Sequence, residues 1–127
     1  MYRLIYTSTA KAHITKANVE DILLNSRVKN HSVLITGILL FGGGHFLQYL
    51  EGGEDTVTRT FDRIAADDRH YEVTILTKGA IEFREFSRWD MANKIVPSDI
   101  LDDTIKAIVR DDFRNVAATL SAIAEVG

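Results

Sequence analysis

The spacing of apolar residues predicts three β-strands in the N-terminal half of the chain. They cover residues 2–8, 34–41 and 45–51. The first alternates in polarity, with Tyr6 beside Leu4 on one face. The second is almost continuous in apolar residues, which is typical of a central strand covered on both faces. The glycines at 42–44 can supply the positive φ angles of a hairpin between the second and third strands.

Apolar residues spaced three and four positions apart predict four helices. These are expected at residues 15–29, 54–68, 99–110 and 112–125. Thr15 is a suitable N-cap for the first helix, and Asn30 lies just past its expected end. Pro97 and the acidic pair Asp111-Asp112 are start signals for the last two helices, which form a C-terminal helical pair.

Two further strands are predicted at residues 72–78 and 80–87, joined tightly at Gly79. The order strand, helix, strand, strand, helix, strand, strand is typical of an α+β sandwich. We therefore predict a ferredoxin-like fold, a mixed five-stranded sheet with two helices on one face. The C-terminal helical pair can cover the other face. The expected division is a sandwich over residues 1–97 and a helical extension over residues 98–127.

Composition narrows the possible functions. The 127 residues carry a formal net charge of −3, with 46% hydrophobic and 26% charged residues, as in an ordinary globular domain. The lack of cysteine excludes disulfides, thiolate metal sites, cysteine nucleophiles and a flavin–cysteine bond. Without a basic run that contains aromatics, direct nucleic-acid binding is not expected. A cytoplasmic protein without membrane contact is expected, because the sequence has no secretory leader or membrane span.

One residue interrupts the apolar pattern of the third strand. The period of two places Gln48 between Phe46 and Leu50, on the face expected to be buried. A buried amide without partners costs about 1–3 kcal/mol, so a polar group must meet Gln48 inside the fold. That group can be a backbone carbonyl, an ordered water or a ligand. Tyr6 can point into the same groove, where Asn30 and the polar end of the second helix would rim a small-molecule site.

Several spaced motifs together resemble a known family, the BLUF domains, or sensors of blue light using FAD. The resemblance covers roughly residues 2–95. It rests on Leu-Ile-Tyr-Thr-Ser around Tyr6, Ser26-Arg27 with Asn30, Ile-Thr-Gly-Ile-Leu-Leu from Ile35, Phe-Leu-Gln-Tyr-Leu-Glu-Gly from Phe46, Asp68-Arg69-His70, and Trp89-Asp90-Met91. By this resemblance, residues 1–97 form a flavin-binding photosensor domain.

The resemblance implies a photoactive group of four residues. Tyr6 matches the family's photo-oxidised tyrosine, and Gln48 matches its switching glutamine. Trp89 and Met91 match two residues that are discussed as exchanging inward and outward positions, although taken alone they fit core packing equally well. An amide is a donor at one end and an acceptor at the other. Gln48 can therefore bridge the Tyr6 hydroxyl and the flavin, and can exchange these roles by rotation or by tautomerisation.

The resemblance also implies the flavin contacts. Asn30 matches the asparagine that hydrogen-bonds the ring edge, and Arg63 and Asp67 match positions on the pyrimidine side. The remaining cofactor-binding residues are Ile22 and, along the ribityl and phosphate side, Arg27, Lys29, Arg69 and His70. Lys29 departs from the asparagine, arginine or histidine that the family often has at its position. No catalytic residue and no metal ligand is expected.

The implied function is that of a non-enzymatic blue-light photoreceptor. FAD is the expected flavin, and FMN or riboflavin would also serve. Electron and proton transfer from Tyr6 through Gln48 would rearrange the hydrogen bonds to the flavin. No effector domain follows the helical pair in this sequence, so the signal is expected to reach an unidentified downstream protein through contacts. The helical pair is also expected to support a homo-oligomer.

Two enzyme functions are alternatives at this point. A ferredoxin-like layout with arginine and asparagine near a loop is compatible with an acylphosphatase-like hydrolase. The first strand, however, leads into Thr9-Ala10-Lys11 and not into a glycine-rich loop whose amides could hold a phosphate. A flavin oxidoreductase is the other alternative. A tyrosine and a glutamine placed to quench an excited flavin favour photochemistry over that reaction.

Overall fold

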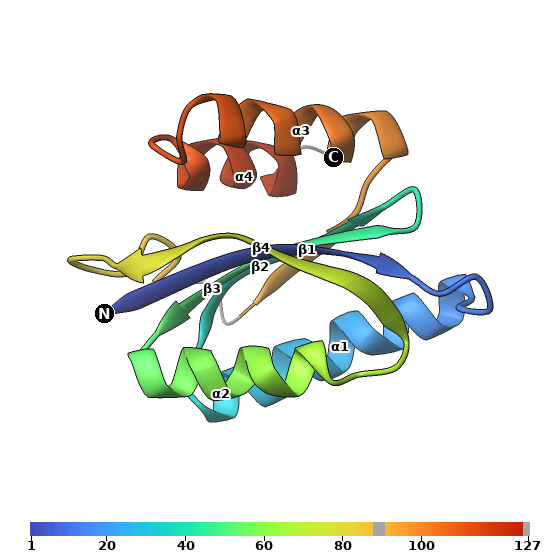
Figure 1. Cartoon of the computed structure of the whole chain (residues 1–127), viewed down its shortest axis with the longest axis horizontal. Helices are drawn as coiled ribbons and strands as arrows, with labels where there is room; N and C mark the ends of the chain where they lie inside the picture. Colours follow the sequence, from blue (N-terminus) through green and yellow to red (C-terminus); the bar gives the residue numbers. More distant parts are fainter. Residues whose placement is uncertain (88–90, 126–127) are drawn as a thin grey trace.

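A five-stranded sheet lies between two layers of helices in the computed structural model, which describes residues 1–87 and 91–125 (Figure 1). In Figure 1, α1 and α2 cover the lower face of the sheet and α3 and α4 cover the upper face. The elements are β1 (Tyr2–Ala10), α1 (Lys16–Ser32), β2 (Thr36–Gly42), β3 (His45–Gly52), α2 (Glu54–Ala65), β4 (His70–Ala80), β5 (Ala92–Ile95), α3 (Ser98–Arg110) and α4 (Val116–Glu125).

The strand order across the sheet is β4-β1-β3-β2-β5. All neighbours are antiparallel except β2 and β5, which are parallel, so the sheet is mixed. The predicted ferredoxin-like α+β class is therefore confirmed, with the C-terminal helical pair on the second face. β3 lies at the centre, and its Gln48 is opposite Tyr6 of β1 and Leu39 of β2. Directly opposed residues point to the same face, so these three side chains lie together.

The second half of the sheet differs from the sequence prediction. Gly79 does not form a turn, because β4 continues through it to Ala80 and pairs Gly79 with Arg3. The strand predicted at 80–87 was wrong, since residues 81–87 are irregular. The fifth strand is β5, whose four residues are too few to give a periodic signal. Its pairing with β2, a strand distant in sequence, defines it.

The helices also differ from their predicted bounds. α1 begins at the predicted cap, since the Thr15 hydroxyl accepts from the Asn18 backbone N–H at 3.2 Å and the Asn18 side chain accepts from the Thr15 N–H at 3.0 Å. It continues to Ser32, which puts Asn30 in its last turn and not past its end. α2 stops at Ala65, and α4 starts only at Val116. The late start reflects the positive φ angles of residues 112 and 113, which break the helix.

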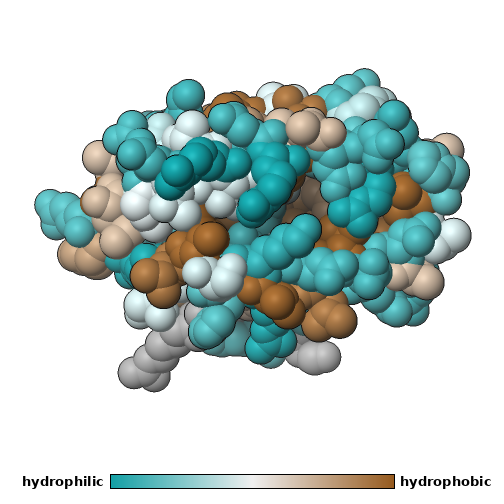
Figure 2. Space-filling model, turned by 90° about the horizontal axis from the view of Figure 1, so that it is seen from below, coloured by the Kyte–Doolittle hydropathy of each residue, from teal (hydrophilic) through white to brown (hydrophobic). Residues whose placement is uncertain are grey.

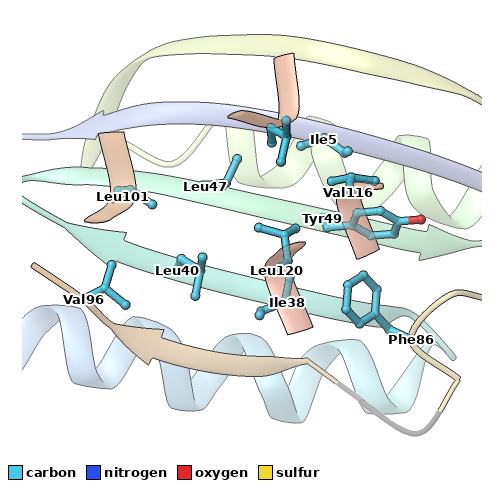
Figure 3. Packing of buried hydrophobic residues seen from close by; sticks show 11 residues of the cluster. Ile5, Ile38, Leu40, Leu47, Tyr49, Phe86, Val96, Leu101, Val116 and Leu120 are labelled. Atoms are coloured by element: carbon cyan, nitrogen blue, oxygen red, sulfur yellow. The ribbon is translucent and has the colours of Figure 1, made fainter. Parts of the chain in front are cut away.

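The two faces of the sheet bury separate apolar clusters. β3 shows why, because its period of two sends Phe46 and Leu50 to one face and Leu47 and Tyr49 to the other. The cluster against α3 and α4 contains Ile5, Ile38, Leu40, Leu47, Tyr49, Phe86, Val96, Leu101, Ile108, Val116 and Leu120 (Figure 3). The cluster against α1 and α2 contains Leu4, Tyr6, Val19, Leu23, Ile35, Leu39, Phe46, Leu50, Val57 and Met91. No helix within the described residues is long and apolar enough to cross a bilayer.

Candidate functional site

A cleft of about 110 Å³ opens between α1, α2 and the sheet. It is lined by Tyr6, Ile22, Asn25, Ser26, Lys29, Asn30, Leu39, Phe46, Gln48, Thr60, Arg63, Ile64, Asp67, Arg69 and His70. Figure 2 shows this face of the molecule, where hydrophilic side chains surround a hollow with hydrophobic surface at its base. The cleft therefore combines apolar walls with a polar rim, as small-molecule sites commonly do.

Tyr6 and Gln48 meet at the base of this cleft. They are opposite residues of β1 and β3, and only 3% of Tyr6 and 1% of Gln48 is exposed. The Tyr6 hydroxyl donates a hydrogen bond of 2.5 Å to Gln48 Oε1. The partner that a buried Gln48 requires is thus Tyr6, from the neighbouring strand.

The other end of the Gln48 amide faces α1 and residue 91. Nε2 is 3.4 Å from Met91 Sδ and 3.5 Å from Ser26 Oγ. Both are weak bonds, since sulfur is a poor acceptor and 3.5 Å is long for a hydroxyl. Ser26 Oγ also accepts from Asn30 Nδ2 at 3.2 Å, which joins the two buried amides. The donor end of Gln48 is therefore held less firmly than its acceptor end.

Met91 is fully buried behind Gln48 and has an unusual backbone conformation. Its φ is 137°, a region that costs a residue with a side chain about 1–3 kcal/mol. The residue packs within the buried cluster against α1 and α2, and Gly37 lies beside it, where a Cβ would be at an ordinary contact distance of 3.5 Å from Met91 Cε but only 1.9 Å from the Tyr49 carbonyl oxygen. Packing therefore holds Met91 in a strained position next to the Tyr6–Gln48 pair.

Nearly all of the sequence-predicted cofactor residues line this cleft. They are Tyr6, Ile22, Lys29, Asn30, Gln48, Arg63, Asp67, Arg69 and His70. Arg27 does not, because it lines a separate groove with Asn93 and Lys94 beside β5. Trp89 lies outside the described residues. Met91 lies directly before β5, and the strand predicted at residues 80–87, which would have preceded it, does not form beyond Ala80.

Several residues that line the cleft are not among the sequence-predicted cofactor residues. Leu39 and Phe46 flank Gln48 on the same face of the sheet, and Ile64 belongs to the apolar face of α2. Ser26 is the polar residue that contacts both buried amides. The strand period could have found Leu39 and Phe46, since it places them on the Gln48 face.

An ion pair forms one end of the polar rim. Arg69 Nε donates to Asp67 Oδ1 at 2.9 Å, and Arg69 Nη2 donates to Asp67 Oδ2 at 2.5 Å. The hydrogen bond from Arg69 holds the pKa of Asp67 below its usual range. Lys29 and Arg63 are exposed at the mouth, and within residues 1–87 and 91–125 neither forms an ion pair. These two are the cations of the cleft that remain available to a ligand.

His70 binds protein atoms with both of its ring nitrogens. Nε2 lies 2.7 Å from the Ile64 carbonyl oxygen, which can only accept, so Nε2 carries a proton. Nδ1 lies 2.7 Å from Ser8 Oγ and, in the neutral ring, accepts from that hydroxyl. The ring also packs edge-on against Phe46, with 6.2 Å between centroids. His70, the first residue of β4, thus joins the end of α2 to β1, and its place on the ribityl and phosphate side stays a prediction.

The ionisation of Tyr6 gives a testable pH dependence. Burial, and secondly the charge of Asp67, raise the pKa of Tyr6 above its ordinary value of about 10. As the pH rises past about 10, the unfolded chain loses this proton before the folded chain does, so the free energy of unfolding falls. We expect the urea midpoint to be lower at about pH 11 than at about pH 8, with the decrease setting in near pH 10, and we expect a smaller decrease in Tyr6→Phe. Equal falls in the two proteins would show that Tyr6 does not contribute.

The chain matches one family model and several proteins of known character. The model described as sensors of blue-light using FAD (BLUF) matches residues 1–92. The blue light- and temperature-regulated antirepressor BluF of Escherichia coli (strain K12) is 31% identical over 105 residues, 83% of this chain and 26% of that protein. The photoactivated adenylate cyclase subunit alpha of Euglena gracilis is 28% identical over 94% of this chain and 12% of that protein. The chain therefore spans about a quarter or less of these two relatives.

A solved structure agrees with this match. The dark-state structure of BlrB, described as a BLUF protein, superposes with a TM-score of 0.74 and 33% sequence identity. The alignment covers 97% of this chain and 94% of that one. The similarity therefore extends through the C-terminal helical pair as well as the sheet with α1 and α2.

Proposed function

This chain belongs to the BLUF family, the sensors of blue light using FAD, and on that premise we propose that Tyr6 and Gln48 form its light-operated switch. BLUF domains are sensory flavin-binding modules, so the domain senses blue light with a flavin. The family match favours this function over the acylphosphatase-like hydrolase and the flavin oxidoreductase. The observation that carries the proposal is the 2.5 Å hydrogen bond from the Tyr6 hydroxyl to Gln48 Oε1, buried at the base of the cleft.

The residues of the cleft fit a flavin ring. Ile22 of α1 and Ile64 of α2 form the apolar walls of the cleft, and Phe46 of β3 forms part of its apolar floor. A flat aromatic ring system suits such a slot. The amides of Asn30 and Gln48 lie at its buried edge and offer the donors and acceptors that alternating carbonyl and N–H groups require. We propose FAD as the natural flavin, with FMN or riboflavin as substitutes.

Tyr6 is suited to release an electron together with a proton. Light excitation of the bound flavin would provide an oxidising power great enough to remove an electron from a tyrosine. A tyrosine with its ordinary pKa of about 10 is protonated near neutral pH, and burial raises the pKa of Tyr6 further, so the proton is present before oxidation. Oxidised phenol is a strong acid, and its proton has Gln48 Oε1 as an acceptor 2.5 Å away.

Gln48 converts this proton transfer into a changed hydrogen-bond pattern. A proton that arrives at Oε1 turns an acceptor into a donor, and Nε2 can release one of its own protons toward the cleft. When the electron and a proton return to Tyr6, the phenol is restored and only the arrangement of the amide has changed. Within residues 1–87 and 91–125, Nε2 forms only the weak contacts with Met91 and Ser26, so few interactions are lost when the amide exchanges its ends. Rotation and tautomerisation both produce this exchange. In either case, the groups that Gln48 presents to the cleft and to Met91 differ between dark and light.

The signal leaves, in this proposal, through the C-terminal helical pair. Met91 is followed directly by β5, and Lys94 of β5 donates to the Ile123 carbonyl of α4 at 3.1 Å. Ile100 and Val109 on α3 are exposed apolar residues that could contact a second copy or a downstream protein. We propose a homo-oligomer whose helix packing, and hence affinity for its partner, changes with light. Residues 98–127 then act as an output extension of the sensor domain.

The chromophore provides the first test. The purified protein is expected to be yellow and to show a reversible light-induced red shift that needs no NAD(P)H. Acid precipitation is expected to release all of the colour, because the chain has no cysteine and both ring nitrogens of His70 already bind protein atoms. Colour retained in the pellet, or a colourless protein that cannot be reconstituted with FAD, FMN or riboflavin, would contradict the proposal.

A further inference from the structure

β5 lies at the edge of the sheet, beside β2 (Figure 3). Its ladder to β2 is prolonged by Val96, whose N–H donates to the Phe41 carbonyl oxygen at 2.8 Å. Because successive residues of a strand direct their backbone groups to opposite sides, Asn93 and Ile95 point their N–H and C=O groups away from β2. Within residues 1–87 and 91–125, nothing hydrogen-bonds to these four groups. The outer side of β5 can therefore pair with another strand.

A groove of about 680 Å³ runs along this open edge. One wall is formed by Asn93, Lys94 and Ile95 of β5. The other wall is formed by α1 residues spaced three and four positions apart, and hence on one face of the helix: Lys16, Glu20, Leu23, Leu24 and Arg27. An edge strand with a helix beside it is an arrangement that holds an extended peptide as an added strand.

Exposed apolar side chains flank the groove. Leu24 and Val28 follow each other by one turn of α1 and are 61% and 64% exposed, and Ile95 is 41% exposed. The Ile95 side chain lies on the α1 side of the sheet, since its neighbour Lys94 points to the other face and donates to the Ile123 carbonyl of α4. Hydrophobic patches interrupt the hydrophilic surface on the face that α1 covers (Figure 2). Apolar groups gathered at an open strand edge are typical of a protein-binding surface.

The charges along the groove favour an acidic partner. Lys16 Nζ lies 4.0 Å from Glu20 Oε1, so these two charges offset each other, and Lys94 turns its amino group to the other face. Arg27 is exposed, and in the described part of the chain no carboxylate pairs with it. The groove thus has a free positive charge in a chain of net charge −3. A second copy paired along β5 would bring its own Arg27 to the same seam, and like charges that meet there are unfavourable.

We propose that the edge of β5 binds an extended, acidic segment of a partner protein as a sixth strand of the sheet. The outward backbone groups of Asn93 and Ile95 hold the main chain of the segment. Leu24 and Ile95 contact its apolar side chains, and Arg27 pairs with its carboxylate. This surface is separate from the flavin cleft, so the inference goes beyond the proposed switch and does not depend on it.

A peptide titration followed by NMR tests the proposal. The probe is the acetylated and amidated hexapeptide Thr-Val-Thr-Val-Thr-Asp, which places both valines and the aspartate on one side when it is extended. Added to the isotope-labelled, flavin-loaded protein in the dark, it should shift the amide signals of Asn93 and Ile95. The signals of β4, at the other edge of the sheet, should not change. A second probe, with lysine in place of the aspartate, should bind about fivefold more weakly or worse.

Two pairs of variants separate the charge from the backbone contribution. Arg27→Glu should weaken binding of the acidic probe about fivefold or more, whereas Arg110→Glu, the same change in the last turn of α3, should not. Ile95→Pro removes an outward N–H without removing a bond to β2, and edge strands tolerate such a proline. It should abolish the shift at Asn93, while Ile95→Val should preserve it. Urea unfolding shows which variants are folded.

Each outcome decides for or against the acidic segment. Shifts at Asn93 and Ile95 that both Arg27→Glu and Ile95→Pro reduce would support it. Equal binding of the two probes, shifts confined to other residues, or no shift at millimolar peptide would overturn it. Dimers in light scattering that Ile95→Pro abolishes would assign the edge to a second copy and overturn the acidic partner. If Ile95→Pro does not fold, the two probes on wild type and Arg27→Glu decide. Probe binding without a light-induced red shift would contradict the proposed switch and leave this inference standing.

Discussion

Gln48→Leu is expected to bind flavin and to show no light-induced red shift. Leucine keeps most of the volume between Phe46 and Leu50, so the cleft keeps its shape. It can neither accept the Tyr6 proton at the position of Oε1 nor present a donor to the cleft. The Tyr6 hydroxyl loses its buried acceptor, which we expect to lower the free energy of unfolding by about 1–3 kcal/mol. Flavin content after purification and a light-minus-dark absorption spectrum measure the two properties separately.

Asn25→Leu is the matched control for this change. Asn25 also lines the cleft, but its side chain is exposed, and the same exchange of an amide for leucine leaves the Tyr6–Gln48 bond intact. This variant should keep a red shift of normal size. If Gln48→Leu also forms a red-shifted state of normal size and lifetime, the proposed switch is wrong, because no other side chain accepts the Tyr6 proton within the described residues.

Tyr6→Phe is the second change with a large expected effect. The ring keeps its place on β1 and its edge-on contact with Phe61, at 5.4 Å between centroids, so flavin should remain bound. Phenylalanine has no hydroxyl to donate, and its ring is far harder to oxidise than a phenol. We therefore expect loss of the normal red shift, with a stability cost of about 1 kcal/mol from the unpaired Gln48 Oε1. Light-minus-dark spectra and urea unfolding check these expectations.

Tyr49→Phe provides a control in the same sheet. Tyr49 is a buried tyrosine one residue from Gln48, and burial raises its pKa as well. Its hydroxyl donates to Glu85 on the opposite face and does not reach the cleft. The red shift should therefore survive in Tyr49→Phe. A full red shift in Tyr6→Phe, or its loss in both variants, would show that the hydroxyl of Tyr6 is not the specific donor.

Patterns between near neighbours were enough to predict much of this protein. The alternation of β3 placed Gln48 on a buried face beside Phe46 and Leu50, and burial alone required a polar partner. The capping residue Thr15 was also correct, because caps depend on a few adjacent residues. Of the hairpin glycines, Gly43 and Gly44 have the predicted positive φ angles, whereas Gly42 is the last residue of β2 and pairs with His45. The spaced motifs identified the family, since each keeps residue types at fixed positions along the chain.

Tertiary structure decided the features that depend on distant segments. β5 exists because its backbone pairs with β2, so nothing within its own four residues could reveal it. Arg27 and Lys29 look equivalent in sequence, but two steps along a helix turn a side chain by about 200°, and only Lys29 reaches the cleft.

Glu51 shows the same limit most clearly. The strand period assigns it to the face of Tyr49, which is correct. The hydrogen bonds of the Glu51 carboxylate come from the backbone amides of Glu85 and Phe86, which belong to an irregular segment distant in sequence. The alternation of a strand depends on the geometry of its own backbone, and so the sequence determines which way a side chain points. What that side chain meets depends on how the rest of the chain closes around it, which only the folded structure decides.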